Sequence, residues 1–326
     1  MNGFDQAIFD QAAGAVLGSA IGDALGAGYE FTDPAPAQEI FMAGGGPFDW
    51  APGEWTDDTQ MAVAILDVIS TGSADLQQIG TNFLTWSGSN PPDIGNQTHS
   101  VLAAAENSED LSAIAAAFLD ANPNSAGNGA LMRTAPVPLA CLNDRDEIAQ
   151  LAESVASLTH AHPDSVNACV LWSLAIQTAI TTAEPDKVFD WESAVRNGLD
   201  HVVEEQQDRW DALIAEAIIG PPNLFNPNGW VVTAFQAALS AIVNTAESKE
   251  DPKSHFQNSL VSAIRIGNDT DTVGAIAGGL LGARWGKKAI PSGWLSLLHG
   301  DRQRNSEQIT SEDLEKLVRN TLQLEK

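Results

Sequence analysis

Two short clusters of Asp and Thr residues have the types and spacing that metal chemistry needs. The first, Trp55–Gln60 (WTDDTQ), precedes the apolar stretch Met61–Ile69, and the second, Gly267–Thr272 (GNDTDT), precedes the apolar stretch Val273–Leu281. Each cluster therefore lies where a loop is expected to turn into a helix. Carboxylate and hydroxyl oxygens are the ligands that Mg²⁺, Mn²⁺ and Ca²⁺ prefer, so each cluster offers several at one point.

Helix capping is the alternative explanation for each cluster alone, since Asp57 followed by Gln60 has the spacing of a capping box. A calcium loop starting at Asp269 is a second alternative for the distal cluster. Its fifth position is Val273, however, and its twelfth is Leu280, where a bidentate glutamate is needed. Because each cluster holds more carboxylates than capping needs, we predict one site of two metal ions, about 3.5–4 Å apart, built from both.

Other loops add polar groups. The loop 90–96 (NPPDIGN) presents the carboxylate of Asp93 in a rigid turn, and the loop 124–129 (NSAGNG) precedes a helix expected to start at Ala130. Such a glycine-rich loop is often an ordinary connection, but it can also direct backbone N–H groups at a phosphate with help from the helix dipole.

Two histidines and a tryptophan are further candidates. His160 and His162 lack the cysteine or third histidine of a zinc site, so we expect hydrogen-bonding roles in a loop. Trp230 stands between a loop and an apolar helix, where it would either pack in the core or stack on a base. No Gly-x-Ser-x-Gly elbow suggests a catalytic serine.

The elements that must position these residues are helices. Ala- and Leu-rich segments alternate with short Gly, Pro, Asn and Asp loops, and strand signals are scarce, which predicts an all-α fold. Glycines at every fourth position of 14–26 predict a central first helix that another helix approaches closely. Further helices are predicted at Gln60–Ser70, Leu111–Leu119, Glu147–Leu158, Ser165–Thr181, Val231–Asn244, Asn258–Ile266 and Val273–Trp285.

We expect residues 1–326 to form one compact domain, with the polar stretch 184–228 as an excursion that contains a long loop. The 16 Lys and Arg against 43 Asp and Glu give a formal charge of −27, which argues against nucleic-acid backbones and anionic membranes as partners. The cysteines, Cys141 and Cys169, each lie in an apolar run and suit free thiols in a reducing compartment. With no secretory signal and no membrane span visible, we expect a cytoplasmic protein.

The sequence resembles the ADP-ribosylglycohydrolase family, which includes dinitrogenase-reductase-activating glycohydrolases and arginine- and serine-directed ADP-ribosylhydrolases. The likeness extends through nearly the whole chain, and the pairing of TDDT with a distal GNDxDT is specific. The loop PDIG and the segment GWVV make the nitrogenase-regulatory branch the closer likeness. The matching segments are Gly14–Phe31 (GAVLGSAIGDALGAGYEF), Gly53–Ala62 (GEWTDDTQMA), Pro92–Thr98 (PDIGNQT), Gly127–Arg133 (GNGALMR), Thr159-His160, Gly229–Leu239 (GWVVTAFQAAL) and Gly267–Gly282 (GNDTDTVGAIAGGLLG).

The resemblance implies roles for individual residues. Glu30 matches a glutamate that gates or activates the reacting centre, and Asp93 matches an acid used by bacterial arginine-directed members. His160 would lie near the distal ribose, and we add Trp230 as a substrate-binding candidate. The implied diphosphate ligands are Ser125, Gly127, Asn128 and Gly129, and the implied ligands of two Mg²⁺ or Mn²⁺ ions are Thr56, Asp57, Asp58, Asp269, Asp271 and Thr272.

The function that follows is metal-dependent hydrolysis of the glycosidic bond between ADP-ribose and an acceptor, with arginine in a protein or small molecule preferred. Paired Asp clusters serve a dimetal phosphohydrolase or diphosphatase equally well. A third alternative is an inactive ADP-ribose-binding or crystallin-like protein. The stretch 184–228 matches the family poorly, which leaves recognition of the acceptor open, because surface loops would choose it.

Overall fold

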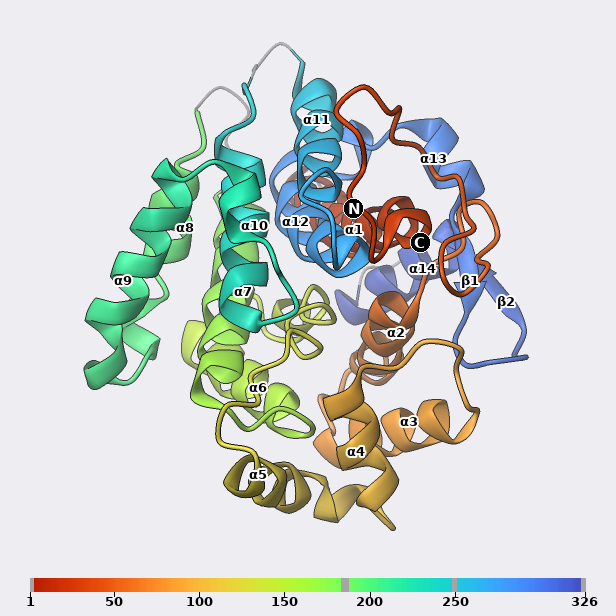
Figure 1. The fold of residues 1–326 in the computed structure, drawn as a ribbon, viewed down its shortest axis with the longest axis vertical. Helices are drawn as coiled ribbons and strands as arrows, with labels where there is room; N and C mark the ends of the chain where they lie inside the picture. The colour runs from red at the N-terminus through yellow and green to blue at the C-terminus, as the bar shows by residue number, and fades with distance from the viewer. Residues whose placement is uncertain (1–2, 183–187, 248–250, 324–326) are drawn as a thin grey trace.

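A computed structural model describes residues 3–182, 188–247 and 251–323, and within these ranges the fold is all-α, as predicted (Figure 1). The secondary structure is helical apart from one two-stranded antiparallel hairpin, β1 (His299–Asp301) with β2 (Gln308–Thr310). The helices are α1 (Gly3–Gly26), α2 (Asp57–Ile69), α3 (Leu76–Gly88), α4 (Asn96–Ala104), α5 (Leu111–Ala121), α6 (Arg145–Ser157), α7 (Pro163–Thr181), α8 (Trp191–Arg196), α9 (Glu204–Ile219), α10 (Val231–Val243), α11 (Pro252–Ile264), α12 (Thr270–Trp285), α13 (Ser292–Leu297) and α14 (Ser311–Thr321).

Helices α1 and α12 form the centre of the molecule and run antiparallel (Figure 1). A Cβ atom added to Gly18 would lie 2.3 Å from the carbonyl oxygen of Gly278, and one added to Gly22 would lie 1.9 Å from that of Gly274. Only glycine permits two backbones to approach this closely. The predicted central first helix is therefore confirmed, and its partner is the helix that follows the second acidic cluster.

The antiparallel pairing also brings two distant parts of the chain together. It places the end of α1 beside the start of α12, where a Cβ atom on Gly26 would lie 2.5 Å from Cα of Asp271. The chain after α1 is held there by backbone bonds from the N–H of Phe31 to the carbonyl of Asn268 (2.6 Å) and from the N–H of Asn268 to the carbonyl of Thr32 (3.0 Å). Glu30 thereby lies next to the second cluster.

The polar stretch 184–228 contains helices as well as the expected loop, which joins α9 to α10. Its described part, 188–228, contains α8, α9 and two 3₁₀ turns, and Figure 1 places α8 and α9 at one edge of the molecule, outside α7 and α10. Arg209 on α9 forms a two-pronged ion pair with the buried carboxylate of Asp164 on α7. Polar composition here reflects an amphipathic outer helix, because α9 buries Trp210 and Ile214 and exposes its other face.

Candidate active site

The chain that follows α1 and the starts of α2 and α12 line a cleft of about 460 Å³. Its lining contains no Lys or Arg among the described residues, so nothing basic balances the acids there. The cleft also receives the glycine-rich loop around Gly127 and the ring of His160. Its six carboxylates are Glu30, Asp57, Asp58, Asp93, Asp269 and Asp271.

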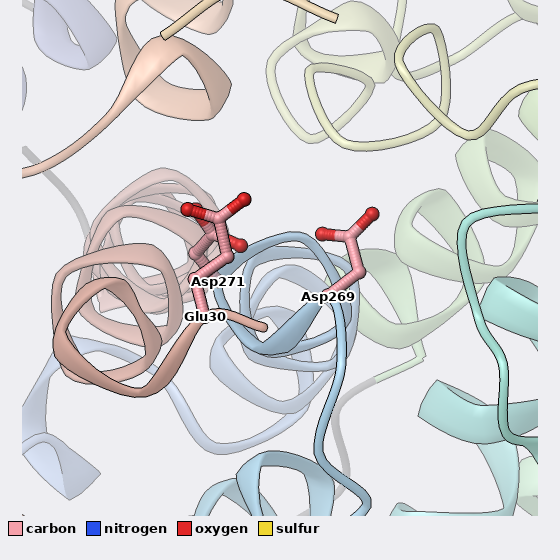
Figure 2. Close-up of side chains that lie close together, drawn as sticks. All are labelled: Glu30, Asp269 and Asp271. Atoms are coloured by element: carbon pink, nitrogen blue, oxygen red, sulfur yellow. The ribbon is translucent and has the colours of Figure 1, made fainter. Parts of the chain in front are cut away.

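Three of these acids are close enough to share one ion. One carboxylate oxygen from each of Glu30, Asp269 and Asp271 lies within 4.8 Å of the other two. Figure 2 shows the three carboxylates on the same side of the backbone, with Asp269 at the N-cap of α12, Asp271 in its first turn and Glu30 on the chain after α1. Glu30, expected to act in catalysis, thus also has the position of a metal ligand.

The first cluster begins α2 in a way that leaves its carboxylates in the cleft. Thr56 is the N-cap, and its hydroxyl accepts from the N–H of Asp58 at 3.4 Å and lies 3.1 Å from Asp58 Oδ2. The expected capping box of Asp57 and Gln60 is absent, because the helix begins at Asp57 and the Gln60 amide oxygen accepts from Trp86 Nε1 at 2.7 Å. Thr56 itself is buried behind the cleft wall.

The two clusters meet in the folded chain. Thr272 Oγ1 lies 3.4 Å from Asp58 Oδ2, across 214 positions of sequence. Asp57 in turn shares a hydrogen bond with Asp93, the acid of the loop before α4. The structure therefore brings the acids of both clusters, Glu30 and Asp93 into a single cleft.

Asp23 is a further residue of the site that no sequence motif singled out. It is fully buried in α1, and its carboxylate accepts from the N–H of Thr56 at 3.0 Å and from the N–H and hydroxyl of Thr59. The first four backbone N–H groups of a helix such as α2 have no acceptor within the helix and need a partner of this kind. The available signal was that Asp23 is the only charged residue in the segment 11–26 of α1.

Asn228 is a second overlooked residue, and it fixes the loop before α12. Its side chain is fully buried, accepts from the N–H of Asp269 at 3.0 Å and donates to the carbonyl of Gly267 at 3.1 Å. Its own carbonyl accepts from Asn128 Nδ2 at 3.1 Å, and the same nitrogen donates to Asp269 Oδ2 at 2.8 Å. No local pattern marks Asn228, because its partners lie far away in sequence.

Burial and mutual repulsion weaken the acidity of the whole cluster. Burial, then the charges of Asp93 and Asp269, raise the pKa of Glu30 to about 9. Burial, then Asp269, raises the pKa of Asp93 to about 7. Burial also raises the pKa values of Asp57, Asp58 and Asp271 well above the ordinary range, with neighbouring acids adding to the effect.

Two carboxylate oxygens at this site, Glu30 Oε2 and Asp58 Oδ1, are buried with no hydrogen-bond partner. Buried carboxylates require a hydrogen bond, an opposite charge or a metal. Hard oxygen donors gathered in one cleft, with two of them unpartnered, fit a divalent cation of the Mg²⁺ or Mn²⁺ type.

The glycine-rich loop lines the cleft through Gly127, Asn128 and Gly129, whereas Ser125 is half-buried outside the lining. The Gly127 N–H is engaged by Gln97 Oε1 at 3.3 Å. The isolated antiparallel bridge between Gly127 and Trp230 directs the Asn128 N–H toward the Gly229 carbonyl, whereas no acceptor for the Gly129 N–H is found among the described residues.

The helix expected to start at Ala130 does not form. Residues 130–133 make turns, with the N–H of Leu131 bonded to the carbonyl of Asn128 at 2.8 Å. Pro136 and Pro138 follow within a few residues, and proline cannot donate the bonds that would extend a helix. The predicted helix is therefore wrong, and no helix dipole points at this loop from that side.

The aromatic candidates occupy different places. His160 is buried and lines the cleft, while His162 caps α7 by accepting from the N–H of Asp164 at 3.0 Å, which confirms the expected loop role. Trp230 lines a second hollow of about 540 Å³ that shares Gly127 and Gly229 with the cleft. Its side chain is 44% exposed, so the core alternative does not apply.

Comparison with known proteins identifies the family. Residues 5–325 match the family model described as ADP-ribosylglycohydrolase. The chain belongs to the ADP-ribosylglycohydrolase family. The resemblance stated from its motifs is thus confirmed, as is the enzyme class, a hydrolase of ADP-ribose glycosidic bonds.

Relatives with related names cover most of the chain. It is 30% identical to "ADP-ribosylarginine hydrolase Tri1" of Serratia proteamaculans, over 89% of this chain and 75% of that protein. It is also 30% identical to the "ADP-ribosyl-[dinitrogen reductase] glycohydrolase" of Rhodospirillum rubrum, over 89% of this chain and 91% of that protein. A solved structure titled "ADP-ribosylglycohydrolase-related protein complex" superposes with a TM-score of 0.75 at 26% identity, covering 98% of this chain and 99% of that one.

The family and the fold agree, since the solved relative covers nearly the whole chain. In the described part of the chain, none of the helices has the length and apolar character needed to cross a membrane. The acidic cluster is compatible with a bound metal, as predicted.

Proposed function

We propose that this protein hydrolyses the N-glycosidic bond between ADP-ribose and arginine, in a modified protein or a small guanidine compound. The observation that carries the proposal is the composition of the cleft, which has six carboxylates and, among its described residues, no Lys or Arg. Such a cleft attracts cations, and a guanidinium acceptor is cationic. The name of one 30% identical relative, an ADP-ribosylarginine hydrolase, supports the same acceptor.

Two Mg²⁺ or Mn²⁺ ions would be held at the junction of the two clusters. The unpartnered Glu30 Oε2 and Asp58 Oδ1 support this assignment. When bound, such ions would hold the ribose hydroxyls and lower the pKa of a coordinated water molecule. The proposed ligands are Thr56, Asp57 and Asp58 from the start of α2 and Asp269, Asp271 and Thr272 from the start of α12, with Glu30 close enough to contribute.

The remaining cleft residues would bind the ADP-ribose group. The glycine-rich loop would hold the diphosphate, with the Gly129 N–H as donor, Gly127 and Asn128 lining the cleft, and Ser125 at the loop's outer end. His160 would contact the distal ribose. Trp230, exposed over the adjoining hollow, offers a face on which the base can stack.

Asp93 and Glu30 would move protons. Hydrolysis gives the anomeric carbon the hydroxyl of a water molecule and returns a proton to the nitrogen that leaves. A general acid for this step needs a pKa near the working pH. The pKa of Asp93, raised to about 7, allows this group to hold and release a proton at neutral pH, and Glu30 would share this role when it is not bound to metal.

A hydrolysis assay on arginine-, serine- and nucleic-acid-linked ADP-ribose tests this proposal. We expect arginine-linked substrate to be cleaved at least about tenfold faster than serine-linked substrate. This is the ratio that one hydrogen bond to a charged group provides. Asp93→Asn should lose activity on the arginine linkage while still binding free ADP-ribose. Asp120→Asn, an exposed acid on α5 outside the cleft, is the matched control and should behave as the parent. A preference for serine, or full activity in Asp93→Asn, would overturn the acceptor assignment.

The products distinguish the alternative functions. A diphosphatase would release AMP and ribose phosphate, whereas the proposed hydrolase releases free ADP-ribose. A binding protein without activity would bind ADP-ribose and leave every substrate intact.

The free thiols Cys141 and Cys169 further support a reducing compartment such as the cytoplasm as the place of action.

A further inference from the structure

Arg133, the first Lys or Arg of the chain, lies buried beneath the cleft instead of lining it. Its guanidinium carbon is 4.4 Å from the centre of the Phe83 ring, and Nη2 donates to the carbonyl of Val155 at 3.2 Å and to Thr159 Oγ1 at 2.7 Å. Within the described residues, no carboxylate forms an ion pair with it. A buried cation without an acid is costly, so its hydrogen bonds call for an explanation beyond stability.

The Thr159 hydroxyl connects Arg133 to His160. Thr159 Oγ1 accepts from Arg133 and lies 2.8 Å from His160 Nδ1. A guanidinium can only donate, so the hydroxyl must direct its own hydrogen elsewhere. Among the described residues, His160 Nδ1 is the acceptor within reach. Nδ1 therefore accepts, and the neutral ring carries its hydrogen on Nε2.

That second nitrogen faces the glycine-rich loop. A Cβ atom added to Gly127 would lie 3.4 Å from His160 Nε2, and one added to Gly129 would lie 3.3 Å away. The same ring lines the cleft. Burial, then the charge of Arg133, lowers the pKa of His160 to about 3, so the ring is neutral at physiological pH.

We propose that Thr159 and Arg133 are positioning residues that hold His160 in the Nε2–H form, so that its ring donates to an oxygen of the ADP-ribose group. This inference rests on the proposed function for the identity of the ligand. A cleft without Lys or Arg among its described lining leaves the oxygens that no metal ion holds to neutral donors, and His160 Nε2–H faces the glycine-rich loop at the same cleft.

The tautomer can be measured directly in the ligand-free protein. We would record ¹⁵N spectra of histidine-labelled protein in Mg²⁺ buffer and assign His160 by its loss in His160→Gln. In the parent, Nε2 is expected to have the shift of a protonated ring nitrogen and Nδ1 that of an unprotonated one. Thr159→Val, which removes only the hydroxyl, should shift the ring toward the Nδ1–H form, and Thr159→Ser should restore the parent pattern. Thr134→Val, another buried threonine, is the matched control and should leave His160 unchanged.

Affinity for ADP-ribose tests the consequence. Loss of one hydrogen bond should weaken binding in Thr159→Val by about two- to tenfold, while Thr159→Ser stays near the parent. In the His160→Gln background, where the amide supplies a donor without Thr159, Thr159→Val should have no further effect. An equal loss in both backgrounds would mean that Thr159 acts only through packing.

Arg133→Met is expected to mix the two ring forms, and if that variant does not fold, the Thr159 variants decide. An unprotonated Nε2 in the parent, or an unchanged tautomer in Thr159→Val, overturns the inference. If the parent does not bind ADP-ribose, the proposed function fails, and the tautomer measurement still decides the positioning roles.

Discussion

Removing divalent cations is expected to lower the Tm of this protein at pH 8, with a loss that shrinks toward pH 5. The pKa values of Asp23, Asp93 and Glu30 are raised to about 6, 7 and 9. Each of these carboxyl groups has a higher pKa in the folded protein than in the unfolded chain. Their contribution to stability is therefore fully present below about pH 4 and is lost as the pH rises through each folded-state pKa. A cation relieves the repulsion but must displace protons, so its stabilising effect grows with pH.

The magnitude follows from mass action. Mg²⁺ at 100 times its Kd stabilises the folded state by about 2.7 kcal/mol. An unfolding entropy of about 2.1 cal/mol/K per residue amounts to about 0.7 kcal/mol/K for 326 residues, so Tm rises by about 4 °C. If binding releases one proton, affinity falls about tenfold per pH unit below the pKa. The rise in Tm caused by Mg²⁺ should then be about 4 °C at pH 8, about 2 °C at pH 7 and under about 1 °C at pH 6.

Thermal unfolding with Mg²⁺ and with EDTA, across this pH range, measures the effect. Asp271→Asn removes one proposed ligand and one buried, repelled charge. At pH 8 without metal it should unfold at or above the Tm of the parent, and it should gain nothing from Mg²⁺. The reasoning is refuted if Mg²⁺ stabilises the parent equally at pH 5 and pH 8, or not at all.

Three further outcomes are expected. Asp269→Ala and chelation by EDTA should each abolish turnover while the far-UV circular dichroism stays helical, and full activity in excess EDTA would contradict the metal assignment. Gly278→Ala puts a Cβ atom 2.0 Å from the Gly18 carbonyl oxygen and should cost about 1–3 kcal/mol or more in chemical denaturation, whereas Gly88→Ala, with no atom within 4 Å, should cost nothing. Asp23→Asn places an amide NH₂ beside the N–H groups of Thr56 and Thr59, and it should lower the free energy of unfolding by about 1–3 kcal/mol. The affinity for Mg²⁺ should fall as well, and parent-like Mg²⁺ binding would show that Asp23 does not position α2.

The sequence by itself determined the fold class and the chemistry of the candidate site. Apolar residues at helical spacing, interrupted by Gly and Pro, predicted helices that overlap α2, α5, α6, α7, α10, α11 and α12. These signals are local, because capping, helix periodicity and turn composition depend on neighbouring residues. Metal-ligand chemistry could likewise be read from residue types, since TDDT and GNDTDT each concentrate carboxylates within one turn.

Only the tertiary structure decided which of these groups meet. The close packing of α1 against α12 brings Glu30 to Asp269 and Asp271, and it is produced by glycines whose partner helix lies far along the chain. Asp23 and Asn228 hold the two acidic loops through bonds that no local pattern reveals. Hydrogen bonds and backbone approaches between distant segments depend on the packing of the whole chain, and this is why the site's composition was predictable while its geometry was not.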